Sequence, residues 1–175
     1  MTTTVQIPVE AYFDGTFEFE PDAEYVDGEI EERPMGEYDH ATWQQAIQVW
    51  FLQHAKAWNI RVRCELRVRV TPTRYRVPDV VVFDRGNPVE QVLTTPPIAV
   101  FEVLSPDDRM SRMLTKLADY ERMGIGTIRV IDPKTKALYR YTHGKLEPVE
   151  FAVEDLQGFP AGSIDWKAIE GLLDL

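Results

Sequence analysis

Two short apolar runs decide the fold of this chain: residues 77–83 read VPDVVVF, and residues 98–104 read IAVFEVL. Each run has the length of one strand, and both of its faces are apolar except at one acidic residue. Strands that are apolar on both faces are typical of the middle of a sheet that helices cover on each side. The two runs therefore predict two central strands of an α/β domain.

The acidic residue is Asp79 in the first run and Glu102 in the second. A carboxylate is rarely buried in an apolar strand unless it is paired or bound to a cation. If the strands are neighbours, their backbones lie about 4.8 Å apart, and both carboxylates can bind one Mg²⁺ at ligand distances of about 2.0–2.1 Å. In the alternative interpretation, Asp79 is a turn residue at the strand edge and Glu102 pairs with a nearby arginine.

Apolar residues at helical spacing predict one helix before and one helix after these strands. The first covers residues 41–58, with Asp39 as its N-cap. The second begins in residues 105–108, SPDD, whose serine is expected to cap it, and it ends at Gly124. Phosphodiester hydrolysis also needs a group that activates water or offsets charge. Lys116 is the candidate, because at the border of the apolar stripe its amine can point toward the sheet. A lysine that reaches out to solvent is the alternative.

The remaining strands follow from alternation and from turn residues. Residues 60–70 alternate strictly and predict one half-buried strand, and residues 127–131 predict another after the second helix. Residues 27–28, DG, and residues 143–144, HG, each predict a hairpin, and a short helix is expected from about Asp165. The order helix, three strands, helix, strand, with a hairpin near each end, predicts an α/β domain with a mixed sheet flanked by helices.

Length and composition fit one globular domain. The chain has 175 residues, of which 44% are hydrophobic and 27% charged, so it can bury a core without disulfides. We expect residues 21–175 to form this domain and residues 1–20 to form a loosely packed N-terminal arm. No apolar run approaches the roughly 18 residues of a membrane helix, and the N-terminus lacks the pattern of a signal peptide. The single cysteine, Cys64, is expected to be a buried structural thiol, and its isolation is typical of a cytoplasmic protein.

The overall charge argues against strong binding to nucleic acid. The net charge is -10 at pH 7, whereas proteins that bind phosphate usually carry a basic surface. The charges are uneven, however. Acidic residues crowd residues 10–39, in which Arg33 is the only basic residue, while Glu65 alone opposes the arginines between residues 61 and 76. These arginines predict a local basic stripe that can bind phosphate on an acidic protein.

The order of several short motifs resembles one known family, the Uma-type restriction-endonuclease-like proteins of the PD-(D/E)XK nuclease superfamily. The motifs are VPDVVV at 77–82, FEVLSP at 101–106, KLADY at 116–120, Gly124, and IDP at 131–133. The sequence EYVDGE at 24–29 and His40 are similar to the family's N-terminal pattern. Each motif is short, so the resemblance rests on their order and spacing over residues 24–133.

The resemblance implies a restriction-endonuclease-like fold and a Mg²⁺-dependent endonuclease that hydrolyses DNA, with Mn²⁺ as a substitute. It implies that Asp79 and Glu102 bind the metal together with the backbone carbonyl of Val103. In the superfamily's usual motif a lysine follows two residues after the glutamate, but Leu104 occupies that position here. Lys116 matches the place to which a subgroup has moved this lysine. The resemblance therefore implies a catalytic set of Asp79, Glu102 and Lys116.

Other positions depart from the family pattern. Many superfamily members carry a glutamate on the first helix, where this chain offers only glutamines: Gln44, Gln45, Gln48 and Gln53. Arg112 stands where relatives usually have an acidic residue, and Arg129 stands where an aromatic residue is usual. Glu29 can add a carboxylate but is expected to be solvated. His40 can act as a local acid or a phosphate contact but is expected to be structural.

These departures support a second hypothesis, a nuclease-fold protein without activity that serves as a nucleic-acid-binding or assembly module. Other enzyme classes fit less well, because the sequence has no glycine-rich phosphate loop, no His/Cys metal cluster and no Gly-x-Ser-x-Gly motif. Cutting both strands of DNA with so small a domain requires two active sites. A homodimer is therefore expected.

Overall fold

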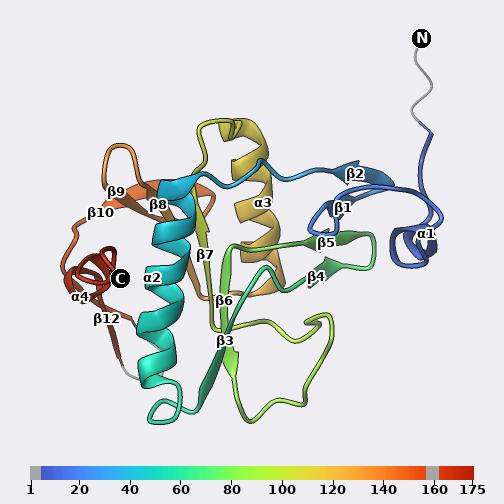
Figure 1. Cartoon of the computed structure of the whole chain (residues 1–175). Helices are drawn as coiled ribbons and strands as arrows, with labels where there is room; N and C mark the ends of the chain where they lie inside the picture. Colours follow the sequence, from blue (N-terminus) through green and yellow to red (C-terminus); the bar gives the residue numbers. More distant parts are fainter. Residues whose placement is uncertain (1–4, 157–161) are drawn as a thin grey trace.

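A six-stranded mixed sheet forms the centre of the molecule in the computed structural model, which describes residues 5–156 and 162–175 (Figure 1). Its strands, in spatial order, are β10 (Lys145–Val149), β9 (Ala137–Thr142), β8 (Thr127–Asp132), β7 (Ala99–Val103), β6 (Val80–Asp84) and β3 (Ile60–Cys64). Only β7 and β8 are parallel, and helix α3 (Met110–Met123) connects them. Together with the preceding helix α2, strands β3, β6 and β7, helix α3 and strand β8 confirm the predicted order of helix, three strands, helix and strand.

The central strands are buried on both faces, as their sequences predict. Every residue of β7 is buried, and in β6 only the final Asp84 is exposed. Val80 and Val82 face one core layer, with helices α2 (Tyr38–His54) and α4 (Trp166–Glu170). Val81 faces the other layer, with α3. The sheet is therefore covered by helices on both faces, which explains the apolar character of both sides.

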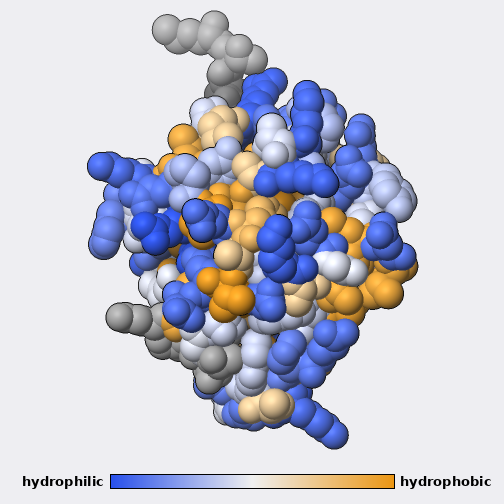
Figure 2. Space-filling model, turned by 90° about the vertical axis from the view of Figure 1, so that its left-hand side faces the viewer, coloured by the Kyte–Doolittle hydropathy of each residue, from blue (hydrophilic) through white to orange (hydrophobic). Residues whose placement is uncertain are grey.

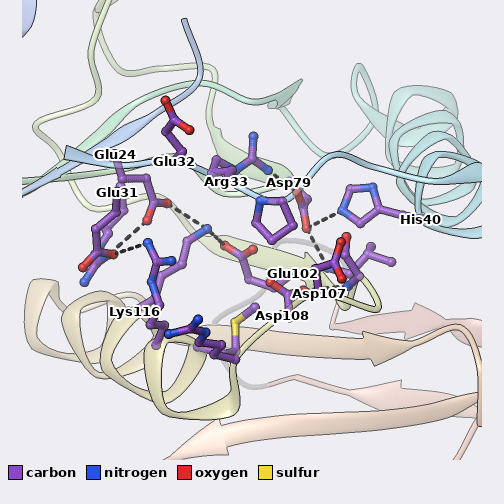
Figure 3. Close-up of a pocket in the computed structure, with 17 residues that line it drawn as sticks. Glu24, Glu31, Glu32, Arg33, His40, Asp79, Glu102, Asp107, Asp108 and Lys116 are labelled. Atoms are coloured by element: carbon purple, nitrogen blue, oxygen red, sulfur yellow. Dashed lines mark hydrogen bonds and ion pairs between the residues drawn. The ribbon is translucent and has the colours of Figure 1, made fainter. Parts of the chain in front are cut away.

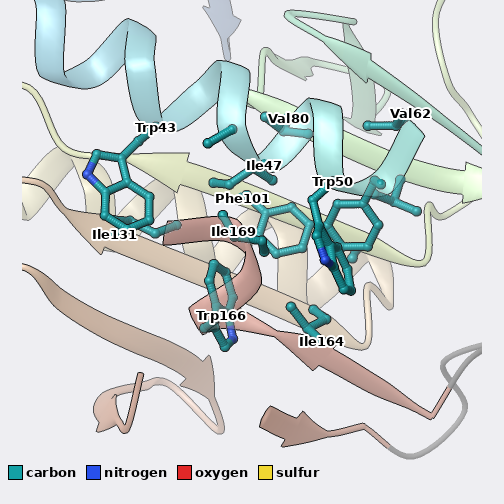
Figure 4. Packing of buried hydrophobic residues seen from close by; sticks show 14 of the residues in the cluster. Trp43, Ile47, Trp50, Val62, Val80, Phe101, Ile131, Ile164, Trp166 and Ile169 are labelled. Carbon is teal, nitrogen blue, oxygen red and sulfur yellow. The ribbon is translucent and has the colours of Figure 1, made fainter. Parts of the chain in front are cut away.

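The layer beneath α2 holds most of the tryptophans (Figure 4). Trp43 and Trp50 of α2 and Trp166 of α4 pack together with Phe101 of β7 in one buried cluster. Core packing accounts for these three, because each is at most 5% exposed.

A second, four-stranded sheet lies beside the first (Figure 1). Its strands, in spatial order, are β2 (Glu29–Glu31), β1 (Glu24–Val26), β5 (Arg74–Arg76) and β4 (Val68–Thr71). The hairpin between β1 and β2 turns at residues 27–28, both of which have positive φ, so the predicted hairpin is confirmed. The arm expected over residues 1–20 is packed on this sheet at one helix, while residues 13–18 are exposed. Helix α1 (Val9–Phe13) buries Tyr12 against Tyr25 and Tyr75.

The prediction of a single strand over residues 60–70 is wrong. The chain forms β3, which pairs with β6 of the large sheet, and then β4, which pairs with β5 of the second sheet. Glu65 separates them with a φ of 54°, in the left-handed region. Alternation of apolar residues shows which face of a strand is buried, but it does not show which sheet the strand joins. The two sheets also divide the arginines between residues 61 and 76, so the predicted basic stripe is not one surface.

Both long helices begin at positions other than those predicted. Helix α2 begins at Tyr38 and ends at His54, with Glu37 rather than Asp39 at the N-cap. Helix α3 begins only at Met110 and has no side-chain cap. Ser105 does not cap it, because Arg109 occupies the N-cap position, and the Ser105 backbone N–H donates to the Asp108 side chain at 2.6 Å in a local turn. Residues 105–108 therefore form a separate turn at the end of β7.

Gly124 ends α3 as predicted, with a φ of 97°. Replacing it with alanine should lower the free energy of unfolding by about 1 kcal/mol, because an L side chain is strained in the left-handed region. A new Cβ would meet no atom within 4 Å, so the backbone conformation alone carries this loss. Urea denaturation measures it. Gly126→Ala is the matched control, since its site is equally open and its φ is not positive. Equal losses in the two variants would contradict the explanation.

The C-terminal part follows the sequence prediction. Residues 143–144 turn the hairpin between β9 and β10, and Asp165 caps α4 by accepting the Ala168 N–H at 3.0 Å. A short sheet of β11 (Val153–Asp155) and β12 (Ser163–Asp165) precedes α4. Arg129 of β8, the departure from the family's aromatic residue, forms an ion pair with Glu154 of β11. This contact joins the C-terminal unit to the central sheet.

The face that carries α4 and the C-terminus is mainly hydrophilic, with hydrophobic side chains visible in patches between the polar ones (Figure 2). Among the helices of the described residues, none has the length and apolar character needed to span a membrane.

Candidate active site

The two acidic residues of the central runs lie side by side. Strands β6 and β7 are antiparallel with Val80 opposite Phe101, so one residue further along the ladder Asp79 lies opposite Glu102. Both residues are 2% exposed. Asp79 also accepts the backbone N–H of Val103 through Oδ2 at 2.7 Å. The structure thus brings together all three residues that were expected to bind metal.

Lys116 reaches these residues from helix α3, which covers this face of the sheet (Figure 3). It lies on α3 and is 7% exposed, so the alternative of a solvent-directed lysine is wrong. Its Nζ lies 2.9 Å from Glu102 Oε1 and donates to the Val77 carbonyl at 2.9 Å. The hydroxyl of Tyr120, one turn further along α3, also donates to Glu102 Oε1, at 2.7 Å. Two groups from one face of α3 therefore hold the Glu102 carboxylate.

Asp79 has cationic partners of its own. Arg33, from the segment between β2 and α2, forms an ion pair with Asp79 Oδ1 and reaches Asp22 at 3.0 Å. His40, in the first turn of α2, places its Nε2 3.2 Å from Asp79 Oδ2. His40, expected from the sequence to be a structural residue beside the first helix, thus contacts the site through its ring.

These surroundings give the two carboxyl groups different pKa values. Burial acts to raise the pKa of Asp79, but the hydrogen bond from His40 and the charge of Arg33 outweigh it and lower the value to about 2. Burial raises the pKa of Glu102 to about 7, and the negative charge of Asp79 adds to this against the attraction of Lys116. Asp79 is thus held as a carboxylate at neutral pH, whereas the surroundings of Glu102 favour its protonated form more than water does.

Lys116 is a cation in this site. Burial acts to lower its pKa, but the charges of Glu102 and Glu24 outweigh this and raise the pKa above its usual value. A protonated amine cannot accept a proton from water. Lys116 is therefore suited to neutralising negative charge and not to acting as a general base.

The second sheet contributes a residue that the sequence did not single out as part of the site. Glu24 of β1 is 4% exposed, and its Oε1 lies 2.8 Å from Lys116 Nζ. Glu29, the hairpin carboxylate considered from the sequence, is exposed as expected. The family-like motif at residues 24–29 contains both residues, and only the packing of the two sheets distinguishes them. Arg33 had one sequence signal, its position as the only basic residue in the acidic stretch of residues 10–39.

The first long helix offers an amide in place of the glutamate found in many superfamily members. Gln44 Nε2 donates to the backbone carbonyl of Asp79 at 2.9 Å. Over residues 5–156 and 162–175, no three side chains of His, Cys, Asp or Glu are grouped so that they could hold a metal ion. The oxygen donors expected from the sequence are the carboxylates of Asp79 and Glu102 and the backbone carbonyl of Val103, and Asp107 and Asp108 also line this cavity.

Most of the arginines between residues 61 and 76 already have partners within the protein. Arg61 donates to backbone carbonyls of the loop after β6, and Arg67 donates to Tyr12 and to the Pro21 carbonyl. Arg74 pairs with Asp27 and Asp119, and Arg76 is fully buried. The prediction that these residues form a phosphate-binding stripe is therefore wrong.

Two other arginines lie nearer the site. Arg109 and Arg112, at the start of α3, line the cavity that contains Asp79, Glu102 and Lys116. Arg112, the departure from an acidic residue in relatives, is half exposed and lies 3.5 Å from Glu31. These two arginines therefore add positive charge at the rim of the cavity to that of Arg33 and Lys116 inside it.

Cys64 is half-buried at the end of β3, and burial raises the pKa of its thiol to about 11. A thiol with so high a pKa is a poor nucleophile at neutral pH. This agrees with the structural role expected for it.

The sequence and the structure both match known proteins. A model of the Uma2 family, described as "Putative restriction endonuclease", matches residues 9–167. A putative nuclease belonging to DUF820 from Anabaena variabilis has a crystal structure that is similar, with a TM-score of 0.75, 22% sequence identity, and coverage of 89% of this chain and 93% of the other. A cryo-EM structure of a DrdV–DNA complex is matched with a TM-score of 0.44, 18% identity, and coverage of 80% of this chain and 12% of the other. No curated protein matches the sequence. The family match and the similarity to the DUF820 structure confirm the restriction-endonuclease-like fold.

Proposed function

This chain belongs to the Uma2 family of putative restriction endonucleases, and from that premise we propose that it is a Mg²⁺-dependent endonuclease that hydrolyses DNA phosphodiester bonds. One observation carries the proposal: Asp79 and Glu102 lie opposite each other on buried strands, with the Lys116 ammonium 2.9 Å from Glu102. A structural core gains nothing from two adjacent buried carboxylates, because each is costly to desolvate.

The donors fit a hard divalent cation. Carboxylate and carbonyl oxygens are the ligands that Mg²⁺ prefers, and Mg²⁺ commonly keeps several waters and binds through one or two carboxylates. Asp79, Glu102 and the Val103 carbonyl form such a set. The raised pKa of Glu102 points the same way, since the positive charges around it do not fully stabilise its ionised form. Mn²⁺ prefers the same oxygen ligands and is expected to substitute.

The residues of the site have separable tasks. When bound, the divalent ion supplies positive charge beside the scissile phosphate and lowers the pKa of water. Arg33 and His40 keep Asp79 ionised, so that it is ready to bind a cation. Lys116 and Tyr120 orient Glu102, and the Lys116 charge offsets negative charge that develops on the phosphate. Arg109 and Arg112 at the cavity rim are placed to attract the DNA backbone.

A nuclease-fold module without activity is the second candidate, and Gln44 favours it. This amide donates to the backbone carbonyl of Asp79 and to the Glu65 side chain, where many superfamily members place a carboxylate. The net charge of -10 also weakens non-specific DNA binding. Metal binding separates the two candidates, because an inert module has no need of a cation between Asp79 and Glu102.

The test combines titration calorimetry with a cleavage assay. Wild type should bind Mn²⁺ and nick supercoiled DNA in the presence of Mg²⁺ or Mn²⁺, and it should not nick DNA in EDTA. Asp79→Asn should lose both properties. Metal binding without cleavage of single- or double-stranded DNA would reject the nuclease proposal, and no metal binding by wild type would support the inert module.

We further propose that double-strand cutting uses a homodimer. Sedimentation with and without DNA measures the mass of the protein in solution and tests this.

Metal affinity should depend on pH. Because the pKa of Glu102 is raised to about 7, a proton competes with the cation for this carboxylate. Below pH 7 the proton is favoured, so Mn²⁺ affinity should fall by about tenfold for each pH unit, as one proton must leave. Above pH 8 the affinity should level off. Calorimetry at pH 6, 7 and 8 measures this, and an affinity that does not change between pH 6 and 8 would contradict it.

A further inference from the structure

The ammonium group of Lys116 is held on all sides by the protein. It has three N–H donors, and three oxygen atoms lie within hydrogen-bonding distance: Glu24 Oε1 at 2.8 Å, Glu102 Oε1 at 2.9 Å and the Val77 carbonyl at 2.9 Å. Only Glu102 belongs to the proposed catalytic set. The shortest of the three contacts goes to Glu24, a residue of the other sheet.

Glu24 is itself fixed in place. Its Oε1 accepts the backbone N–H of Val77 at 2.8 Å, and its Oε2 accepts from Arg76 Nη1 at 3.0 Å. Burial acts to raise its pKa, but the charges of Lys116 and Arg76 outweigh burial and lower it. Glu24 is therefore an ionised carboxylate with both oxygens bound, and it cannot turn away from Lys116 without breaking these contacts.

The contacts close a ring between the second sheet and α3. Arg76 of β5 also donates from Nε to Asp119 Oδ2 at 2.8 Å, and Asp119 lies on α3 three residues after Lys116. The path from Lys116 through Glu24, Arg76 and Asp119 thus returns to the helix on which it began. Two anchor points on one helix fix both its position and its rotation relative to the sheet.

We propose that Glu24 is a positioning residue of the active site, which holds the Lys116 ammonium against Glu102. The second sheet then forms part of the catalytic machinery, because it supplies the residue that directs the lysine. Without the negative charge of Glu24, the Lys116 ammonium loses the ion pair at its shortest contact, and the long side chain gains other conformations. A shift of about 1 Å at a catalytic group can cost about 10²-fold in rate. The consequence for rate rests on the proposed nuclease function, whereas the placement of Lys116 does not.

Lysine-selective ¹⁵N labelling tests the placement without DNA or metal. The chain has few lysines: Lys56, Lys116, Lys134, Lys136, Lys145 and Lys167. Of these, Lys116 is the buried one, so wild type should give one ammonium signal with slow hydrogen exchange, which Lys116→Met removes. Glu24→Gln should speed this exchange at least tenfold. Glu31→Gln is the matched control, since Glu31 accepts from the same Arg76 nitrogen at 3.0 Å but lies outside the three Lys116 contacts.

The outcomes separate this proposal from the proposed function. A wild-type spectrum without a protected ammonium signal would overturn it, as would an unchanged Lys116 signal in Glu24→Gln. If Glu24→Gln does not fold, the wild type decides through nuclear Overhauser effects between the Lys116 ammonium and the Glu24 side chain. In cleavage assays Glu24→Gln should be slower by about 10- to 100-fold, with Mn²⁺ affinity within threefold of wild type. Full activity with a lost ammonium signal would also overturn it. A wild type that cleaves no DNA would reject the nuclease function and leave the spectra to decide the positioning.

Discussion

Glu102→Gln should lower the rate of DNA cleavage by at least about 10²- to 10³-fold and remove measurable Mn²⁺ binding. Glutamine keeps the shape of the side chain and can still accept from Tyr120 and Lys116, which lie 2.7 and 2.9 Å from Oε1. It removes the anionic oxygen that a divalent cation needs beside Asp79. Single-turnover cleavage with saturating Mg²⁺ and calorimetry with Mn²⁺ measure the two effects.

The same variant should remain folded and lose no more than about 1 kcal/mol of stability. Burial and the charge of Asp79 raise the pKa of Glu102 to about 7, so its ionised form is stabilised little by the fold. Below its unfolded pKa near 4.5 this group favours folding fully, and that contribution is lost as the pH rises through 7. At pH 8 a neutral glutamine therefore removes repulsion from Asp79, while Lys116 keeps Glu24 as a partner.

Glu147→Gln is the control for this variant, because Glu147 is a half-exposed residue of β10 that pairs with Arg140 far from the site. It should cleave DNA and bind metal like wild type. If Glu102→Gln retained cleavage equal to that of Glu147→Gln, the activity would come from a contaminant or from another site. If it instead unfolded, Glu102 would be a structural residue of the core.

The part of the site that the sequence predicts is the part built by local pattern. Asp79 and Glu102 stand out because each interrupts an apolar strand, and neighbouring strands in an antiparallel ladder bring such residues together. Lys116 follows from helix periodicity, which places it on the same face as Leu117 and Tyr120. In each of these cases the side chain's direction is set by its own element.

The residues that the sequence did not assign to the site are held by contacts between distant segments. Arg33 reaches Asp79 across 46 residues of sequence, and Glu24 reaches Val77 across 53. Both come from short or irregular segments whose place depends on how the second sheet docks on the first. The missed break at Glu65 has the same origin, because the alternating pattern continues across the point where the chain changes sheets. Local pattern predicts which faces are buried, and packing between sheets decides what they meet.

Arg76→Met should destabilise the protein by about 3–5 kcal/mol, the usual cost of removing one partner from a buried ion pair. Arg76 is 1% exposed and binds three carboxylates, those of Glu24, Glu31 and Asp119. Methionine fills much of the space but leaves these groups without their shared cation. Urea denaturation at pH 7.5 measures the loss. Arg140→Met is the control, because its pair with Glu147 is exposed and should contribute only about 0–1 kcal/mol.

The dependence of this loss on pH distinguishes a charge effect from a packing effect. Arg76 helps to lower the pKa of Glu24, so in wild type this carboxylate adds stability above its unfolded pKa near 4.5 and loses it as the pH falls. In Arg76→Met that lowering is weaker, and acid therefore costs the variant less than it costs wild type. The difference in unfolding free energy between the two should stay near its pH 7.5 value down to about pH 4.5 and shrink between pH 4.5 and pH 3. A difference that stays constant over this range would mean that Arg76 acts through its volume, and the ring between the second sheet and α3 would then be held by packing and not by charge.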